Sequence, residues 1–333
     1  MRYIIIGAGA VGGALGGRLA EAGHEVVLVA RGAHHEALRD HGLRLTVAEG
    51  PHIHRLPVVR HPEELGHLRE DDVLMLAVKT QDSTAALDAW APRPVAGGGT
   101  AGERLPLVCA QNGVESERLA LRRFRRVYGM CVWLPATHVE PGSVTAVFAP
   151  VTGVLHLGRF PSGTDETVRS ISAALEKSHF DAPVVDDVMR WKYGKLLGNL
   201  ANSVEAVTGP VTGEEARAVC RAARAEGRTV LAAAGLETVT DAEAAEVRSR
   251  LRFEPADASP RGGSSWQSLS RGTGTIEADF LNGEIVLLGR LHGIPTPVNE
   301  VLQRVADTFA RERRAAGSMT VAELTGLVEA ARH

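Results

Sequence analysis

The chain has 333 residues, of which 44% are hydrophobic, and its 37 basic and 40 acidic residues give a formal net charge of −3. This length predicts two domains, and the nearly balanced charge argues against a nucleic-acid or membrane partner. The sequence has three widely separated cysteines and no stretch of the ~20 apolar residues that a membrane span requires, so we expect a cytoplasmic protein without disulfides that acts on a small molecule.

Short apolar runs alternate with helical patterns through the first half of the chain. Strands are predicted at 3–6, 25–30, 72–78 and 105–110, and helices at 11–22, 33–41, 82–90 and 116–124. This alternation is typical of βα units around a buried parallel sheet. The β-rich runs between 126 and 160 predict antiparallel strands at the sheet edge, and a helix is expected near 165–177. The fold class is therefore α/β, with an N-terminal Rossmann-type doubly wound sheet.

Mostly helical sequence follows from Val188 onward. We place the boundary at residue 183, which gives a nucleotide-binding domain at 1–183 and an all-helical substrate domain at 184–333. The Gly-, Pro- and Ala-rich stretch 252–263 is interpreted as either an ordinary connection or a mobile flap. The apolar helix 280–291 and the amphipathic segment 298–310 are compatible with a homodimer and equally with a core.

A glycine motif follows the first predicted strand. Gly7, Gly9 and Gly12 form G-x-G-x-x-G at the start of a helix. Glycines there let the chain turn tightly and approach a pyrophosphate, which the helix N-terminus attracts. The second strand leads to Arg31, where NAD-binding proteins place Asp or Glu, so NADP(H) is favoured. The alternatives are a glycine turn without a ligand and a free surface arginine.

Two further strand ends carry polar side chains. Lys79 follows the third strand, and Gln111 and Asn112 follow the fourth. Ligands of such sheets bind beyond the carboxyl ends of the strands, so these residues are candidates for the cofactor site. A solvated lysine and an ordinary Asn-Gly turn are the alternatives.

The segment 187–209 has the pattern of one helix. Its polar residues fall at i, i+4, i+7 and i+8, on one face bordered by apolar residues: Lys195, Asn199, Asn202 and Ser203. A second polar stretch supplies Ser264, Ser265 and Glu277. Each is also compatible with a solvated or interhelical polar face. Beside a dinucleotide, a lysine ammonium would stabilise charge on a carbonyl oxygen and supply a proton.

Six ordered motifs resemble the ketopantoate reductase (2-dehydropantoate 2-reductase) family over nearly the whole chain. They are "GAGAVGG", "ARG", "VKTQD", "QNG", "RWKYGKLLGN", and "SS" followed by the Glu of "IEADFLNG". The resemblance implies a Rossmann domain followed by a helical domain like that of 6-phosphogluconate dehydrogenase, with NADPH and substrate between them. It also implies reduction of ketopantoate to pantoate, a step of pantothenate biosynthesis.

The resemblance also implies roles for particular residues. Lys195 would be the general acid and Glu277 its acidic partner; Lys192 is the alternative lysine, but only Lys195 has the Lys-x-x-x-Asn spacing. The residues expected to bind the cofactor are Gly7, Gly9, Ala10, Val11, Gly12, Arg31, Lys79 and Asn112. The residues expected to bind the substrate are Asn112, Lys195, Asn199, Asn202, Ser203, Ser265 and Glu277.

Two positions depart from the family pattern. Ser203 and Gly262 stand where the ketopantoate enzymes usually carry asparagine. A related enzyme that acts on a different carbonyl or alcohol is therefore the alternative. A nucleotide-binding sensor without chemistry is disfavoured, since a sensor needs neither Lys195 nor Glu277. No metal site is expected, because histidine pairs such as His52-x-His54 lack the helical spacing of zinc proteases.

Overall fold

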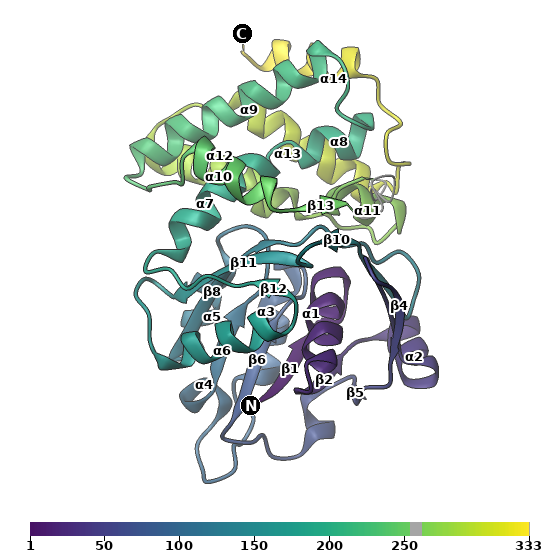
Figure 1. Cartoon of the computed structure of the whole chain (residues 1–333). Helices are drawn as coiled ribbons and strands as arrows, with labels where there is room; N and C mark the ends of the chain where they lie inside the picture. Colours follow the sequence, from purple (N-terminus) through teal and green to yellow (C-terminus); the bar gives the residue numbers. More distant parts are fainter. Residues whose placement is uncertain (254–261, 333) are drawn as a thin grey trace. The chain divides into compact units, whose positions relative to one another are not determined.

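The computed structural model describes residues 1–253 and 262–332, which form two compact units (Figure 1). The first unit contains residues 1–192 and 240–253, and the second contains residues 193–239 and 262–332. Most of the loop expected at 252–263 lies outside the described residues. None of the helices in the described ranges has the length and apolar character needed to cross a membrane.

An eight-stranded sheet forms the centre of the first unit, in the order β12-β11-β8-β7-β6-β1-β2-β5. Neighbouring strands are parallel except β8 and β11, which are antiparallel. The structure thus confirms the predicted parallel sheet with an antiparallel pairing toward one edge. The strands are β1 (Arg2–Ile6), β2 (Glu25–Val29), β5 (Val58–Val59), β6 (Asp72–Leu76), β7 (Pro106–Cys109), β8 (Arg126–Trp133), β11 (Gly153–Arg159) and β12 (Phe180–Asp181).

Helices bury both faces of this sheet. Along β1, Tyr3 and Ile5 belong to one buried cluster, while Ile4 and Ile6 belong to another. Alternate side chains of a strand point to opposite faces, so a strand buried on both sides reads as a continuous apolar run. The helices of this unit are α1 (Ala10–Glu21), α2 (Gly32–His41), α3 (Ser83–Trp90), α4 (Ala101–Arg104), α5 (Ser116–Leu121), α6 (Glu166–Lys177) and α10 (Asp241–Ser249), with short 3₁₀ turns η1 (Pro62–Leu65) and η2 (Thr80–Asp82).

A small second sheet was not expected from the sequence. Its strands β3 (Leu43–Val47), β4 (Gly50–His54) and β9 (Ser143–Ala146) pair in the order β4-β3-β9. β4 reads "GPHIH", which has only one apolar residue besides Pro and therefore carries almost no strand signal. Gly17 of α1 lets the sheet approach closely, since a Cβ there would lie 2.7 Å from a methyl carbon of Leu45. A further short pair joins β10 (Phe148–Ala149) to β13 (Arg252–Phe253).

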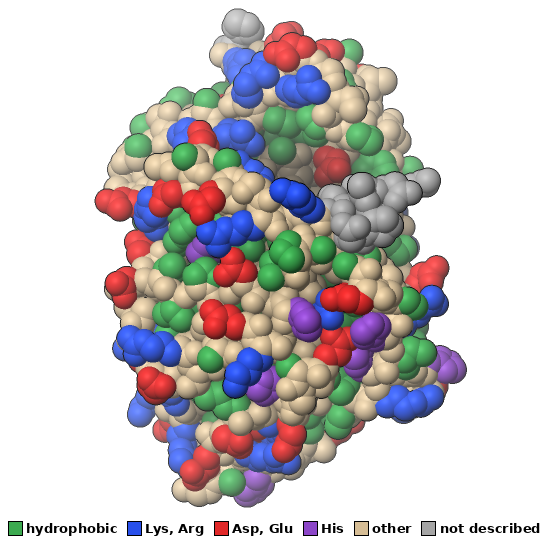
Figure 2. All heavy atoms as spheres, in the orientation of Figure 1, with side chains coloured by type: hydrophobic (Ala, Val, Ile, Leu, Met, Phe, Trp, Pro, Cys, Tyr) green, Lys and Arg blue, Asp and Glu red, His purple; other side chains and the backbone are tan. Residues whose placement is uncertain are grey.

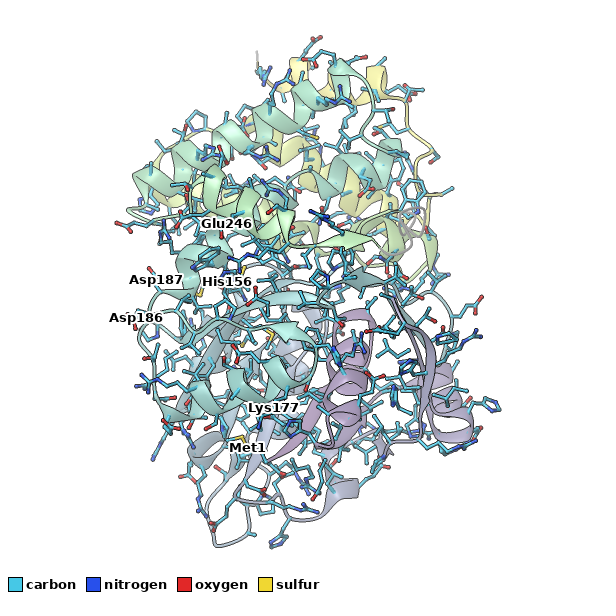
Figure 3. The ribbon with its side chains drawn as sticks, in the orientation of Figure 1. Met1, His156, Lys177, Asp186, Asp187 and Glu246 are labelled. Carbon is cyan, nitrogen blue, oxygen red and sulfur yellow. The ribbon has the colours of Figure 1, made fainter. Side chains whose placement is uncertain are left out.

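Helix α7 (Val188–Asn199) begins in the first unit and ends in the second. Near its start, Trp191 stacks on His156 of β11, which Figure 3 labels, with ring centroids 3.6 Å apart. Burial lowers the pKa of His156 to about 4, so the stacked ring is neutral. The two compact units therefore divide after Lys192, later than the domain boundary expected at residue 183. That domain boundary stays a prediction.

The segment 240–253 belongs to the first unit, and two ion pairs connect it to the rest of that unit. Glu243 of α10 pairs with Arg190 at 2.8 Å, and Arg250 pairs with Asp181 at 2.8 Å.

The second unit is helical, as predicted. It contains most of α7, α8 (Asn202–Thr208), α9 (Glu214–Ala233), α11 (Ser264–Ser270), η3 (Glu277–Phe280), α12 (Asn282–His292), α13 (Pro297–Arg311) and α14 (Val321–Arg332).

The single helix predicted at 187–209 is wrong, because the chain breaks between α7 and α8 at residues 200–201. Asn282, which is fully buried, stabilises the break. Its amide nitrogen donates to the carbonyl oxygen of Leu200 at 3.2 Å and to Asn299 at 3.0 Å, and its oxygen accepts from the Ser203 hydroxyl at 2.6 Å. Lys195 and Asn199 still lie one turn apart on α7, whereas Asn202 and Ser203 belong to a separate helix, α8, so the four residues do not share the face of one continuous helix.

We predict that Asn282→Ala lowers the free energy of unfolding of the helical unit by about 3 kcal/mol. The substitution leaves several buried polar groups unpaired, each at a cost of about 1–3 kcal/mol. Chemical denaturation followed by circular dichroism measures the change. Asn202→Ala, at a half-buried asparagine beside the same break, is the matched control and should change it by less than about 1 kcal/mol. Equal effects of the two substitutions would contradict this account of the break.

Candidate active site

The carboxyl ends of four neighbouring strands are level with one another. Ile6 pairs with Val29 and with Leu76, and Leu76 pairs with Cys109. The loops that follow these strands therefore emerge at one edge of the sheet. These loops and the first turn of α1 carry the predicted cofactor residues, which are Gly7, Gly9, Ala10, Val11, Gly12, Arg31, Lys79 and Asn112.

The glycine loop between β1 and α1 is closely packed on one side and open on the other. Gly7 has φ +103°, and a Cβ there would lie 2.8 Å from the backbone nitrogen of Val78. A Cβ on Gly12 would lie 2.0 Å from the carbonyl oxygen of Gly7, whereas a Cβ on Gly9 would meet no described atom within 4 Å. Gly9 also precedes the first turn of α1, in which Ala10 and Val11 lie. This loop fits a pyrophosphate, because its open side faces the helix N-terminus.

His34 of α2 holds the glycine loop in place. Its Nδ1 accepts a hydrogen bond from the backbone N–H of Gly142 at 2.9 Å, so its Nε2 carries the proton and donates to the carbonyl oxygen of Ala8 at 2.8 Å. The ring also packs against His138, with centroids 4.2 Å apart. The sequence pattern does not indicate this role; its only signal is that His34 lies three residues after Arg31.

Arg31 and Lys79 lie at the ends of β2 and β6. The Arg31 side chain is 69% exposed, and its guanidinium nitrogen lies 3.7 Å from a carboxylate oxygen of Asp82. An exposed pair at this distance is weak, so the guanidinium can turn toward a phosphate. Lys79 is half-buried and immediately precedes η2. Both positions are compatible with binding of an anionic cofactor at this edge.

A buried network fixes the turn that contains Gln111 and Asn112. The Gln111 side chain donates to the carbonyl oxygen of Val78 and to the Ser83 hydroxyl, both at 2.8 Å. The carbonyl oxygen of Gln111 accepts from Lys192 Nζ at 3.1 Å. Asn112, the next residue, is half-buried. The backbone on which Asn112 lies is therefore held by groups from three other segments.

Lys192 also forms a buried ion pair with Glu117 of α5. Their side chains are only 2% and 0% exposed. Burial raises the pKa of Glu117, while the Lys192 ammonium counteracts part of that rise. The ammonium is thus committed to Glu117 and to the Gln111 backbone. This arrangement argues against Lys192 as the catalytic lysine and gives it a positioning role.

The predicted acid–base residues belong to the second unit. Lys195 is half-buried on α7, and Asn199 lies one turn further along. The Asn199 amide nitrogen is buried and has no hydrogen-bond partner among the described residues, which is a costly state that a substrate oxygen would relieve. Glu277, only 4% exposed, begins η3. Burial lowers the pKa of Arg271, and the negative charge of Glu277 counteracts this, which indicates that the two groups interact.

The remaining predicted substrate residues differ in how accessible they are. Ser265 is 2% exposed on α11, which packs against α8. Asn202 is half-buried, but Ser203 is 1% exposed and its hydroxyl is occupied by Asn282. At Gly262, with φ +79°, a Cβ would lie 2.2 Å from Cγ of Trp266. The indole therefore excludes a side chain at the position where the family carries asparagine.

Comparisons with known proteins agree with these features. Residues 3–162 match the family model "Ketopantoate reductase PanE/ApbA", and residues 187–310 match the model of its C-terminal domain. A 2-dehydropantoate 2-reductase of Mesorhizobium japonicum is 32% identical, over 94% of this chain and 99% of that protein. One from Archaeoglobus fulgidus is 30% identical, over 90% of this chain and 95% of that protein.

Solved structures show the same fold. A PanE/ApbA family ketopantoate reductase from Ralstonia eutropha has a TM-score of 0.77 and 29% identity, covering 94% of this chain and all of that one. A D-mandelate dehydrogenase with NADH and anilino(oxo)acetate has a TM-score of 0.78 at 21% identity, over 95% of this chain and all of that one, and it shows the fold alone. On the evidence of both family models and of relatives that match nearly its whole length, the chain belongs to the ketopantoate reductase family, oxidoreductases that act on a keto acid.

Proposed function

We propose that this chain reduces a 2-keto acid with NADPH, and that 2-dehydropantoate, reduced to pantoate, is its first candidate substrate. One observation carries the proposal. Of the two lysines near the start of α7, Lys192 is committed to a buried ion pair, whereas Lys195 lies one turn before a buried, unpaired amide nitrogen on Asn199. A cation followed by an unpaired donor suits a keto acid, which presents a carbonyl oxygen and a carboxylate.

The first unit supplies groups that fit a phosphorylated dinucleotide. The N–H groups of Ala10 and Val11 at the start of α1 would bind the pyrophosphate, and Gly9 leaves room for it. Arg31 would pair with the 2′-phosphate, which NAD lacks. Lys79 and Asn112 would line the same site. Bound NADPH would supply the hydride for the reaction.

The second unit supplies the groups that would act on the substrate. When a keto carbon accepts a hydride, negative charge develops on its oxygen. The Lys195 ammonium would stabilise that charge and donate the proton, and one such donor contributes about 3 kcal/mol to transition-state stabilisation. The buried carboxylate of Glu277 would keep Lys195 protonated, and the Asn199 amide would donate to the substrate.

A second candidate substrate is a 2-keto acid with a less polar side chain than ketopantoate. Two observations favour it. The Ser203 hydroxyl is already used by Asn282, and Trp266 fills the space beside Gly262. The family's ketopantoate enzymes usually carry asparagine at both positions. A buried substrate hydroxyl left without a partner would cost about 1–3 kcal/mol, so an apolar group is better suited to this pocket.

We predict that Lys195→Ala lowers kcat at least about 100-fold, because the variant lacks the proton donor and the charge that stabilises the carbonyl oxygen. NADPH binding, measured by fluorescence titration, should change less than about twofold. Lys177→Ala, at an exposed lysine of α6, is the matched control and should leave both quantities unchanged. Normal turnover by Lys195→Ala would reject its assigned role.

We predict that Arg31→Ala raises the Kd for NADPH about 10-fold to 100-fold and leaves the Kd for NADH unchanged. A charge-assisted hydrogen bond to the 2′-phosphate contributes about 1.5–3 kcal/mol, and NADH has no such phosphate. Arg39→Ala, on the exposed surface of α2, the helix that follows Arg31, is the control. An equal loss for both cofactors would contradict selection of NADPH by Arg31.

A substrate panel decides between the two candidates. The kcat/KM for ketopantoate is compared with those for 2-keto acids of equal size that lack its hydroxyl. If ketopantoate is the substrate, it should be preferred at least tenfold. A tenfold preference for the analogues without the hydroxyl would establish the second candidate, and negligible turnover of every 2-keto acid would reject the proposed reaction altogether.

A further inference from the structure

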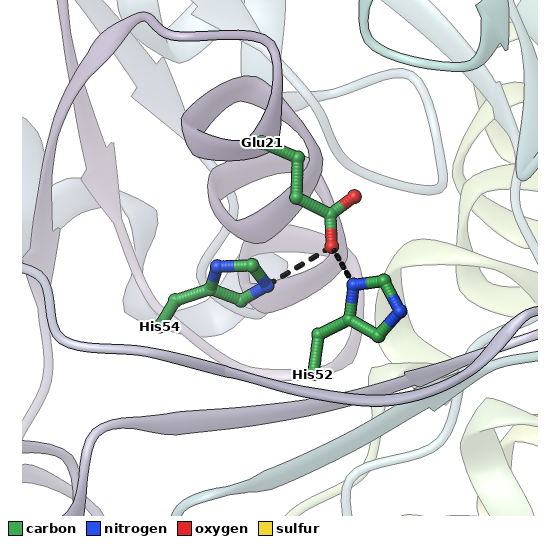
Figure 4. Close-up of side chains that lie close together, drawn as sticks. All are labelled: Glu21, His52 and His54. Carbon is green, nitrogen blue, oxygen red and sulfur yellow. Dashed lines mark hydrogen bonds and ion pairs between the residues drawn. The ribbon is translucent and has the colours of Figure 1, made fainter.

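Three side chains converge at the carboxyl end of α1, at the opposite end of the helix from the glycine loop. His52 Nδ1 lies 2.7 Å from Oε1 of Glu21, and His54 Nε2 lies 3.1 Å from the same oxygen (Figure 4). The three ligand atoms all lie within 4.8 Å of one another. We propose that Glu21, His52 and His54 bind one divalent transition-metal ion of the Zn²⁺ class.

Two rigid elements present the three side chains. His52 and His54 are two residues apart on β4, so both point to one face of the strand. Ile53 between them points away and is 65% exposed. Glu21 lies in the last turn of α1, and Gly17, one turn earlier, brings β4 close to the helix, since a Cβ there would lie 3.4 Å from the His54 ring. Ligands on a helix and a strand hold their geometry better than ligands on loops.

His54 has an ion-pair contact with Glu21 but no well-directed hydrogen bond to any described residue. Its Nε2 is buried and lies 3.1 Å from Oε1 of Glu21. A buried nitrogen without a well-directed hydrogen bond costs free energy. A cation placed between the nitrogen and the carboxylate would accept electron density from both atoms and remove this cost.

The carboxylate of Glu21 is itself held in position. Its other oxygen, Oε2, accepts from Arg18 at 2.8 Å, and Arg18 is fixed in turn by Glu49 at 2.9 Å and by the Thr152 hydroxyl at 2.8 Å. Such outer partners are typical of metal sites because they orient the ligands. With neutral histidines, the two glutamates and one arginine sum to a charge of −1 (−2 + 1), which favours a cation.

The donor set indicates which metal would bind. Two imidazoles and one carboxylate suit Zn²⁺, whereas Ca²⁺ and Mg²⁺ prefer oxygen ligands only. Tetrahedral coordination with bonds of about 2.0–2.1 Å requires ligand atoms about 3.3 Å apart, so the His54 and His52 nitrogens need to move away from Oε1 of Glu21 by about 0.2 and 0.6 Å. The His52 side chain is 40% exposed, which leaves the ion a path of entry and a fourth position for water.

The surface over this cluster is accessible. Figure 2 shows histidine and acidic side chains gathered on the face over α1 and β4. A metal ion bound there would link α1 to the β3–β4 hairpin. The β4 strand of this hairpin contains little apolar sequence. Its role would be structural, because no residue of the proposed reduction belongs to the cluster.

The test is a titration of the tag-free, chelator-treated full-length protein with Zn²⁺ by calorimetry, and with Co²⁺ by visible absorption. We expect one ion per chain, tetrahedral Co²⁺ bands, and a metal-dependent rise in the thermal midpoint. His52→Ala and Glu21→Gln should each weaken binding at least about tenfold, with circular dichroism spectra like that of the parent protein.

His61→Ala, at an exposed histidine outside the cluster, is the matched control and should bind like the parent protein. Two results would overturn the proposal. One is the absence of saturable Zn²⁺ binding by the parent protein. The other is unchanged stoichiometry and affinity in both His52→Ala and Glu21→Gln, which would assign any binding to histidines elsewhere. Neither result depends on the proposed reductase activity.

Discussion

The buried ion pair between Lys192 and Glu117 links segments that are far apart in the chain, the start of α7 and helix α5 with the turn before it. Two nearly unexposed charges are tolerated because they pair with each other and because the Gln111 carbonyl oxygen accepts a further hydrogen bond from the ammonium. Removal of one partner would leave the other charged in the interior. The pair therefore fixes the start of α7 and the turn before Asn112 at the same time.

This constraint gives the two neighbouring lysines of α7 different surroundings. Lys192 is buried in the first unit, where its ammonium pairs with Glu117. Lys195 lies in the second unit and is only half-buried. Lys192 therefore has a positioning role, and a catalytic role for Lys195 belongs to the proposed function. Both lie in a single motif, "RWKYGKLLGN", and spacing alone favours Lys195 without showing what Lys192 does.

Backbone geometry shapes the surroundings of the candidate residues at two places. One is the glycine loop of the first unit, and the other is the helix break of the second unit. At Gly7 and Gly12 a side chain would collide with neighbouring backbone, so these glycines are required for packing. At residues 200–201 the helix ends early, and Asn282 satisfies the carbonyl group that the break releases. Ser203, just after the break, is buried, and its hydroxyl donates to Asn282. Trp266 similarly excludes a side chain at position 262, so both departures from the family pattern have identifiable packing reasons.

The amino-acid sequence alone predicts the α/β class, the parallel sheet, the helical second unit and the family, because these depend on local periodicity and on motifs of fixed spacing. It also located the glycine loop and the strand ends, since residues that follow parallel strands must lie at one edge. Hydrogen bonds and ion pairs between side chains and distant partners in the chain become known from the tertiary structure alone. Examples are the contacts of Ser203 with Asn282, Lys192 with Glu117, His34 with Ala8, and Glu21 with His52 and His54. Such pairings depend on how distant segments pack, and neither composition nor periodicity records them.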